Sequence, residues 1–233
     1  MNIKKYFYIS QEEFISRERN IFIPICLGNK FFFNKDVPSE NIKKYLGWAL
    51  MHTKEKVLFV VVDKIQDTNF FVRNKRRTEQ ASLRYVLKQG EIIKNEIEKI
   101  IHRLSQQDQK RVEVIVWEDY EQEDPFWHQT LELAYAQFKN KKKFKESILD
   151  AVKKSVTDRV FTIEEYLKLC EYVLDEFSIV YSGVTYQGVL YSVYPYPETD
   201  AVLELIEKIK ENAIFHDIHT KLPFIKTGVV ILK

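Results

Sequence analysis

Cysteine, glycine and proline are scarce in this chain. Its 233 residues include two cysteines, six glycines and six prolines. Two cysteines do not make a disulfide framework, and neither has metal-ligand spacing with its neighbours, so we expect no disulfide scaffold and no metal site. No stretch reaches the roughly 18 apolar residues of a membrane span, and the N-terminal segment lacks the apolar core of a secretory signal. We therefore expect a cytoplasmic protein that does not insert into membranes.

Nucleotide-binding signatures are also missing. No GxxxxGK[ST] or GxGxxG pattern follows a predicted strand, so the usual glycine-rich phosphate turn is not expected. Patterns similar to the HxGH and KMSKS signatures of amino-acid activation are absent as well. We expect a chemistry that uses no ATP, no metal and no redox cofactor.

The segments that are present alternate between strands and helices. Short apolar runs rich in β-branched residues predict strands over 21–26, 57–62 and 112–117, with helices over 39–52 and 73–104 between them. This order predicts a parallel sheet with right-handed crossovers. The second half predicts helices over 126–156, 162–177 and 199–213, and strands over 178–181, 189–194 and 229–232. Because no repeat or linker divides the chain, we predict one doubly wound, Rossmann-like α/β domain over residues 1–233.

Cys26 ends the first of these strands, and such sheets bind ligands at the carboxyl ends of their strands. Gly28 and Asn29 follow it, and a glycine allows a sharp turn whose N–H groups could hold an oxyanion. A cysteine that closes an apolar strand is nevertheless more often a small buried hydrophobe than a nucleophile. On position alone, both interpretations stay open.

Tyr172 and Glu176 are four residues apart on a predicted helix, which starts with a capping box formed by Thr162 and Glu165. The spacing places both side chains on one face of the helix. Together they offer a hydrogen-bond donor and a carboxylate that could hold an ammonium group or move a proton. The alternative is a surface carboxylate beside a half-buried tyrosine.

A basic stripe is predicted on the helix over 73–104. At 100° per residue, five cations fall within roughly 120° of its circumference: Arg73, Arg76, Arg77, Arg84 and Lys88. Such a stripe matches a phosphate backbone, although it also matches the solvated face of an amphipathic helix. A second lysine run, KNKKKFK over 139–145, is denser but less one-sided.

Three segments together resemble the tRNA-dependent cyclodipeptide synthases. IFIPICLGNKFF (21–32) is similar to the first motif of that family, YVLDEFS (172–178) to its second, and SVYPYP (192–197) to the Ser-Val-x-x-Tyr stretch that follows. The order and spacing agree over roughly residues 20–215. The resemblance implies a fold similar to the catalytic domains of class I tyrosyl- and tryptophanyl-tRNA synthetases.

The resemblance also implies an activity. Two aminoacyl-tRNAs would react in a ping-pong sequence, first giving an aminoacyl-enzyme, then a dipeptidyl-enzyme that cyclises and leaves as a diketopiperazine. A monomer or a weak homodimer is expected. Two alternatives remain: a non-catalytic module that binds aminoacyl-tRNA, and a thiol hydrolase with an incidental basic helix.

The resemblance assigns roles by position. Cys26 stands at the place of the nucleophilic serine, Tyr172 and Glu176 match residues that hold the first amino group, and Tyr196 matches a tyrosine that assists near the nucleophile. The implied tRNA-binding residues are Arg73, Lys75, Arg76, Arg77, Arg84 and Lys88. The implied substrate-binding residues are Gly28, Asn29, Phe22, Val61, Asp63, Ile179, Val180 and Tyr194. Polar groups on Asp63 and Tyr194 would favour a polar first amino acid.

The chain departs from the family pattern at several positions. Cys26 replaces the serine, Pro24 a glycine, Asn20 a histidine and Ser178 a proline, while Pro197 places the chain with the Tyr-Pro branch. Cysteine for serine is chemically permissive, because a thiolate is a strong nucleophile and a thioester still reacts with amines.

Overall fold

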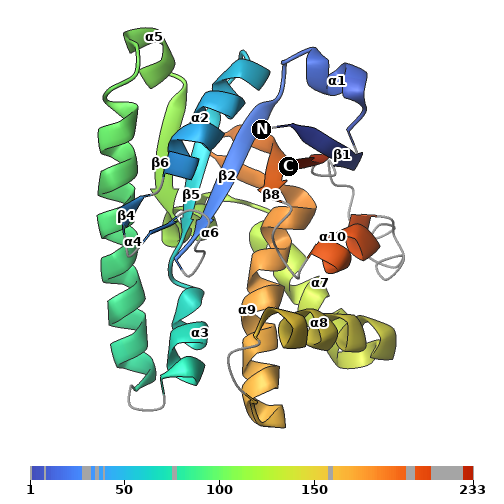
Figure 1. Cartoon of the computed structure of the whole chain (residues 1–233). Helices are drawn as coiled ribbons and strands as arrows, with labels where there is room; N and C mark the ends of the chain where they lie inside the picture. The colour runs from blue at the N-terminus through green and yellow to red at the C-terminus, as the bar shows by residue number, and fades with distance from the viewer. Residues whose placement is uncertain are drawn as a thin grey trace.

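The computed structural model describes residues 2–7, 9–27, 33–34, 37–38, 40–74, 78–156, 160–197, 203–210 and 228–232 (Figure 1). The strands are β1 (Ile3–Phe7), β2 (Asn20–Cys26), β3 (Phe33–Asn34), β4 (Val37–Pro38), β5 (Val57–Val62), β6 (Val112–Val116), β7 (Val184–Tyr186), β8 (Val189–Pro197) and β9 (Gly228–Leu232). The helices are α1 (Gln11–Ile15), α2 (Glu40–His52), α3 (Gln66–Arg73), α4 (Glu79–Ile101), α5 (Gln106–Gln109), α6 (Trp117–Glu123), α7 (Trp127–Asn140), α8 (Lys142–Ser155), α9 (Ile163–Ser182) and α10 (Leu203–Lys210).

The main sheet has seven strands in the order β1-β9-β8-β2-β5-β6, with β7 paired to β8 outside this path. The pairs from β9 to β6 are parallel, whereas β1–β9 and β7–β8 are antiparallel. The sheet is therefore mainly parallel, as predicted. The prediction missed β1, α1, β3, β4, α5, α6 and β7, and all of α3 except Arg73.

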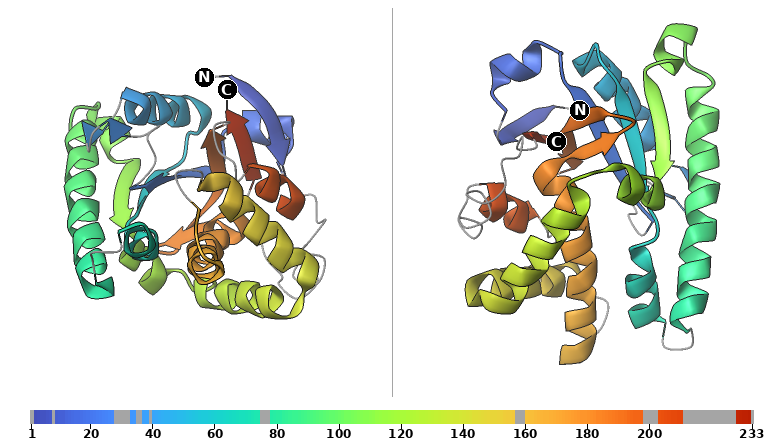
Figure 2. Two further views of the ribbon diagram at one scale, coloured as in Figure 1. Left: turned by 60° about the horizontal axis from the view of Figure 1, so that its bottom comes forward. Right: turned by 180° about the vertical axis from the view of Figure 1, so that it is seen from behind.

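The two central strands, β2 and β5, separate two cores. Their odd-numbered side chains, such as Ile23 and Phe59, pack with α2 and α4. Their even-numbered ones, such as Phe22 and Val60, pack with α6, α7 and α9. In the rear view of Figure 2, α7 and α9 extend downward past the lower end of the strands. All six residues of β5 are buried, as expected for a parallel strand covered on both faces. The doubly wound prediction is confirmed.

Strand β2 is the point at which the strand order reverses. The chain proceeds from β2 to β5 and β6 on one side, and later adds β8 and β9 on the other. Asn20 bridges both neighbours at the start of β2: its Nδ2 donates to the Leu190 carbonyl in β8 at 2.8 Å, and its Oδ1 accepts from the Lys56 N–H at 3.0 Å. In sheets of this type, the reversal point at the carboxyl edge is where ligands bind.

Of the two long helices predicted from the sequence, the one over 126–156 is divided, and the one over 73–104 begins later, as α4, with the separate helix α3 before it. Helix α3 ends at Arg73, and the Thr78 hydroxyl accepts from the Ala81 N–H at 3.1 Å to begin α4. Lys141, with an extended backbone (φ −116°, ψ 106°), separates α7 from α8. Neither break contains a proline or glycine, so no residue there signals that a helix ends. The prediction of single helices over 73–104 and 126–156 is wrong.

Helix α9 begins where predicted and ends later. The Thr162 hydroxyl accepts from the Glu165 N–H at 3.2 Å and the Glu165 carboxylate accepts from the Thr162 N–H at 2.8 Å, which confirms the capping box. The helix continues to Ser182 and stops at Gly183, whose φ of 77° suits glycine. The predicted strand over 178–181 is wrong because burial of Ile179 against the sheet outweighs the strand propensity of β-branched residues.

Candidate active site

Cys26 lies at the carboxyl end of β2, at the reversal point of the sheet. Its Cα is paired with Val62, the last residue of β5. The side chain is half-buried, forms no disulfide bond, and packs at the edge of the core under α6, α7 and α9. The sequence predicted this position correctly, and the structure adds which face of the sheet the thiol occupies.

Helix α9 brings two polar side chains to this thiol. The Cys26 Sγ donates to Glu176 Oε1 at 3.1 Å, and the Tyr172 hydroxyl donates to Cys26 Sγ at 3.6 Å. Because Tyr172 and Glu176 are four residues apart, one face of one helix supplies both contacts. The three predicted residues therefore form one hydrogen-bonded chain that runs from hydroxyl to thiol to carboxylate.

Tyr172 acts in this chain as a neutral donor. Burial raises the pKa of its hydroxyl well above the usual value, and the neighbouring Cys26 and Glu176 raise it further. The hydroxyl therefore keeps its proton near neutral pH. A proton-bearing phenol beside sulfur can stabilise negative charge that develops there or on a nearby carbonyl oxygen.

An apolar wall lies against the polar group. Phe22 from β2, Ile179 and Val180 from α9, and Tyr194 from β8 belong to the same buried cluster, with Cys26 and Tyr172 at its edge. The rings of Phe22 and Tyr194 are stacked, with their centroids 5.3 Å apart. The structure thus brings these four predicted substrate-binding residues together.

Val61 and Asp63 lie elsewhere, and their predicted place in the pocket is corrected. Val61 faces the opposite core, with α2 and α4. The Asp63 carboxyl is buried, and its Oδ1 accepts from the backbone N–H of Lys64 at 2.8 Å and of Trp117 at 3.1 Å. A Cβ added at Gly90 of α4 would lie 2.1 Å from Asp63 Oδ2. Residues of odd number on β5 point away from Cys26, which is the physical reason for the error.

Some predicted residues lie outside the described part of the chain. These are Gly28 and Asn29 after Cys26, and Lys75, Arg76 and Arg77 between α3 and α4. Tyr196 is described only in its backbone, where it pairs with Ile231 of β9. Their functional roles stay predictions.

The predicted basic stripe does not exist as one helical face. Arg73 is the last residue of α3, whereas the exposed Arg84 and Lys88 are on α4. The angular argument assumed a continuous helix, and the break after Arg73 removes it. Arg84 and Lys88 remain on one face of α4, four residues apart.

Sequence reasoning missed a second carboxyl beside the site. Asp175 precedes Glu176, and its Oδ1 accepts from the Tyr135 hydroxyl of α7 at 3.1 Å. Burial raises the pKa of Asp175 to about 7, and the nearby carboxylates of Glu171, Glu121 and Asp67 add to the rise while the Tyr135 hydroxyl opposes it. Its place next to Glu176 was visible in the sequence, but the partner on α7 was not.

The other thiol has a different environment. Cys170 is fully buried among apolar side chains of α7, α8 and α9, including Phe144 and Leu174. Burial raises the pKa of its thiol to about 12. Cys170 is therefore a core residue, whereas the Cys26 side chain is only half-buried.

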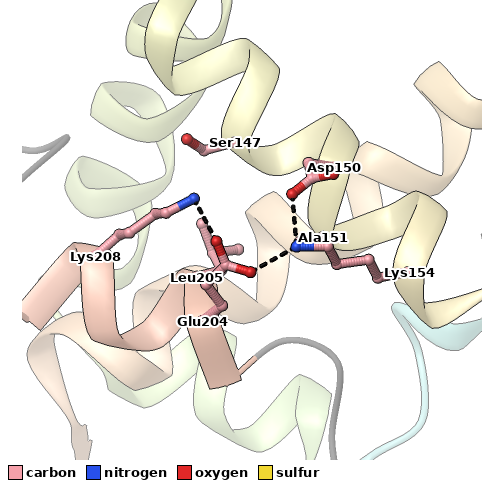
Figure 3. A pocket seen from close by; sticks show the side chains of 7 residues that line it. All are labelled: Ser147, Asp150, Ala151, Lys154, Glu204, Leu205 and Lys208. Carbon is pink, nitrogen blue, oxygen red and sulfur yellow. Dashed lines mark hydrogen bonds and ion pairs between the residues drawn. The ribbon is translucent and has the colours of Figure 1, made fainter.

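A small hollow lies away from this site, between α8 and α10 (Figure 3). Lys154 pairs with Asp150 and Glu204 there, and Lys208 pairs with Glu204 at 2.8 Å. These ion pairs satisfy charged groups that line the hollow, and the pair of Lys154 with Glu204 links α8 to α10. Among the described residues, no three potential metal ligands gather at one point, and no helix has the length and apolar character needed to cross a membrane.

The chain matches no protein-family model and no curated protein. Its fold matches solved structures. A cyclodipeptide synthase from Bacillus thermoamylovorans is similar with a TM-score of 0.74 and 17% identity, over 95% of this chain and 91% of that one. A Mycobacterium tuberculosis protein, whose structure demonstrates that cyclodipeptide synthetases are related to type I tRNA synthetases, has a TM-score of 0.65 and 13% identity over 84% of this chain and 81% of that one.

A third solved structure is a cyclodipeptide synthase from Candidatus Glomeribacter gigasporarum bound to Phe-tRNAPhe. It has a TM-score of 0.55 and 11% identity, over 83% of this chain and 84% of that one. The three structures agree on one architecture, which the predicted resemblance had indicated from three short motifs. This chain has the fold of the cyclodipeptide synthases.

Proposed function

We propose that this protein is a tRNA-dependent cyclodipeptide synthase that uses Cys26 as its nucleophile. The observation that carries the proposal is the hydrogen-bonded chain of Tyr172, Cys26 and Glu176 at the reversal point of the sheet. The fold supports it, since one protein of this fold has been solved with Phe-tRNAPhe bound. Aminoacyl-tRNAs are accordingly the proposed substrates of this chain.

The proposed reaction begins at sulfur. The Cys26 thiolate attacks the ester carbonyl of the first aminoacyl-tRNA, an S–C bond forms, the ester C–O bond breaks, and the tRNA leaves with a proton on its ribose oxygen. The amine of the aminoacyl-enzyme then attacks the ester carbonyl of the second aminoacyl-tRNA. An N–C bond forms, the ester C–O bond breaks, and the second tRNA leaves with the amine proton on its ribose oxygen, which gives a dipeptidyl-enzyme. Attack of the free amine on the thioester closes the ring, and the Cys26 sulfur is the leaving group.

Each side chain has a place in this scheme. Glu176 pairs with the α-ammonium group of the first aminoacyl moiety, and Tyr172 donates to the reacting centre. The wall of Phe22, Ile179, Val180 and Tyr194 contacts the amino-acid side chain. The inference of a polar first amino acid rested on Asp63 and Tyr194. Because Asp63 lies on the other face of the sheet, Tyr194 alone still supports it.

The test is incubation with a charged tRNA pool, followed by intact-mass analysis and mass spectrometry of small products. We expect one aminoacyl mass on the wild-type chain and on Cys26→Ser, a diketopiperazine from at least one of them, and neither signal from Cys26→Ala. Cys170→Ala is the matched control and keeps both signals, because that thiol is buried in the core.

Other outcomes identify the alternatives. Salt-sensitive tRNA binding without an acyl mass on residue 26 would indicate a binding module. Hydrolysis that depends on Cys26 but is unaffected by charge reversal at Arg84 and Lys88 would indicate a thiol hydrolase. Either result would overturn the proposal.

A further inference from the structure

The hydrogen bond from Cys26 to Glu176 describes the thiol before any substrate arrives. The S–H group donates to a carboxylate oxygen at 3.1 Å, so the sulfur carries its proton in this arrangement. A carboxylate that accepts this bond stabilises the neutral thiol, and its negative charge opposes a second negative charge on sulfur. In this state the nucleophile is held in its less reactive form.

The other ionisable groups near Glu176 on α9 and the neighbouring helices are mostly acidic. On α9 itself they are Tyr172, Glu171 and Asp175, and Asp67 of α3 and Glu121 of α6 act electrostatically on Asp175. Lys64 pairs with Glu121. The Glu176 carboxylate, which contacts the sulfur, disfavours a thiolate and attracts a cation, whereas the neutral Tyr172 hydroxyl, which donates to the sulfur, favours the thiolate.

We propose that Glu176 keeps Cys26 as a neutral thiol until the α-ammonium group of an aminoacyl donor takes the place of the thiol on the carboxylate. The inference rests on the proposed function, in which Cys26 is the acyl acceptor. It adds that the ammonium group of the substrate frees the Cys26 thiol to ionise, and it defines the donor class as α-aminoacyl esters with a free ammonium group. Donors with an acylated amine leave Glu176 bonded to sulfur.

The steps balance without a further reagent. Binding of the ammonium group neutralises the carboxylate charge, and the thiol ionises by releasing its proton to water. The thiolate then attacks the donor carbonyl, the S–C bond forms and the C–O bond of the donor breaks. The departing alkoxide takes a proton from water, so the net change is exchange of an ester for a thioester.

The first experiment measures the rate of Cys26 alkylation by iodoacetamide against pH, with the modified residue identified by peptide mass. In the wild-type chain we expect a rate midpoint above that of Glu176→Gln by about one pH unit or more, because glutamine removes the charge and retains the shape. Cys170 is the internal reference and stays unmodified while the protein is folded. Equal midpoints in the two proteins would overturn the inference.

The second experiment adds a ligand that cannot acylate the thiol. An equimolar mixture of L-amino-acid amides is expected to lower the wild-type midpoint and to raise the alkylation rate near pH 7 by about tenfold, as one unit of pKa implies. The matched N-acetyl amides leave it unchanged, and Glu176→Gln responds to neither mixture. An equal response to both mixtures, or protection of Cys26 by the free amines, would contradict the inference.

These readouts need neither tRNA nor turnover, so the two proposals fail separately. A shift in midpoint without diketopiperazine formation retains the ammonium effect and rejects the synthase. Diketopiperazine formation without a shift retains the synthase and rejects the ammonium effect. If Glu176→Gln does not fold, the comparison of the two amide mixtures on the wild-type chain still decides the matter.

Discussion

Two carboxyl groups near the carboxyl ends of β2 and β5 have opposite surroundings. On one face of the sheet, Asp63 accepts from two backbone N–H groups and lies against Gly90 of α4. On the other face, Glu176 accepts from the Cys26 thiol, which Tyr172 also contacts. Partners on the main chain are fixed by the fold, whereas a thiol can be replaced on the carboxylate by a ligand. Asp63 therefore has a structural role, whereas Glu176 is placed to bind a ligand.

The largest expected effect is on stability and tests the contact between Gly90 and Asp63. Gly90→Ala places a Cβ 2.1 Å from Asp63 Oδ2 and 2.6 Å from Asp63 Cβ, and a Cβ cannot move without its backbone. We expect the free energy of unfolding to fall by about 3 kcal/mol, even though alanine favours a helix. Urea denaturation followed by circular dichroism measures the change.

Gly47→Ala is the matched control, since Gly47 is on α2 and its added Cβ meets no atom within 4 Å. We expect this variant to be as stable as the wild-type chain, or more stable by about 0.5–1 kcal/mol. Equal losses in the two variants would show that Gly90 has no special relation to Asp63.

The second effect is on the rate of aminoacyl transfer and tests the hydrogen bond from Tyr172 to Cys26. Tyr172→Phe removes the hydroxyl that donates to Cys26 Sγ and keeps the ring that packs at the edge of the core. We expect the rate of aminoacyl transfer to Cys26 to fall by roughly tenfold to a hundredfold, with stability unchanged. Single-turnover assays with labelled aminoacyl-tRNA measure the rate. Tyr186→Phe, whose hydroxyl accepts only from Gln187 at 3.2 Å among the described contacts, is the control and keeps the wild-type rate.

The smallest effect concerns Asp175, whose partner is a side-chain hydroxyl. Its pKa rises from 3.8 to about 7 on folding, so the folded chain binds more protons between these values. Stability supplied by this group therefore falls as pH rises from about 4 to 7, by on the order of 1–2 kcal/mol after allowance for solvent screening. Asp175→Asn removes this slope, which chemical denaturation at pH 4.5, 6 and 7.5 measures. An unchanged slope in the variant would contradict the assignment.

Local patterns in the sequence predicted most of the elements that form the site. The apolar runs located β2 and β5, the capping box located the start of α9, and the four-residue spacing placed Tyr172 and Glu176 on one face. Each of these signals depends on neighbouring residues alone. The contact between Cys26 and α9 joins residues 146 and 150 positions apart. The family resemblance placed these residues in one site, but it did not predict the hydrogen bonds between them.

The errors in secondary structure arose where tertiary packing, and not the local sequence, determines where a helix ends. Burial of Ile179 kept α9 helical through a β-branched segment, and no residue typical of a helix break marks Lys141. The misplacement of Val61 and Asp63 has another cause. A strand end lies near a site as a whole, but only alternate side chains face it, and the sequence of a fully buried strand does not reveal which ones.

The continuity of α9 fixes one dimension of the proposed active site. Tyr172 and Glu176 are separated by four helical residues, a rise of about 6 Å along the axis. Their separation is therefore set by backbone hydrogen bonding, whatever packs around the helix. A substrate that contacts both groups must therefore match this fixed spacing. Differences in amino-acid specificity would have to come from the apolar side chains of Phe22, Ile179, Val180 and Tyr194.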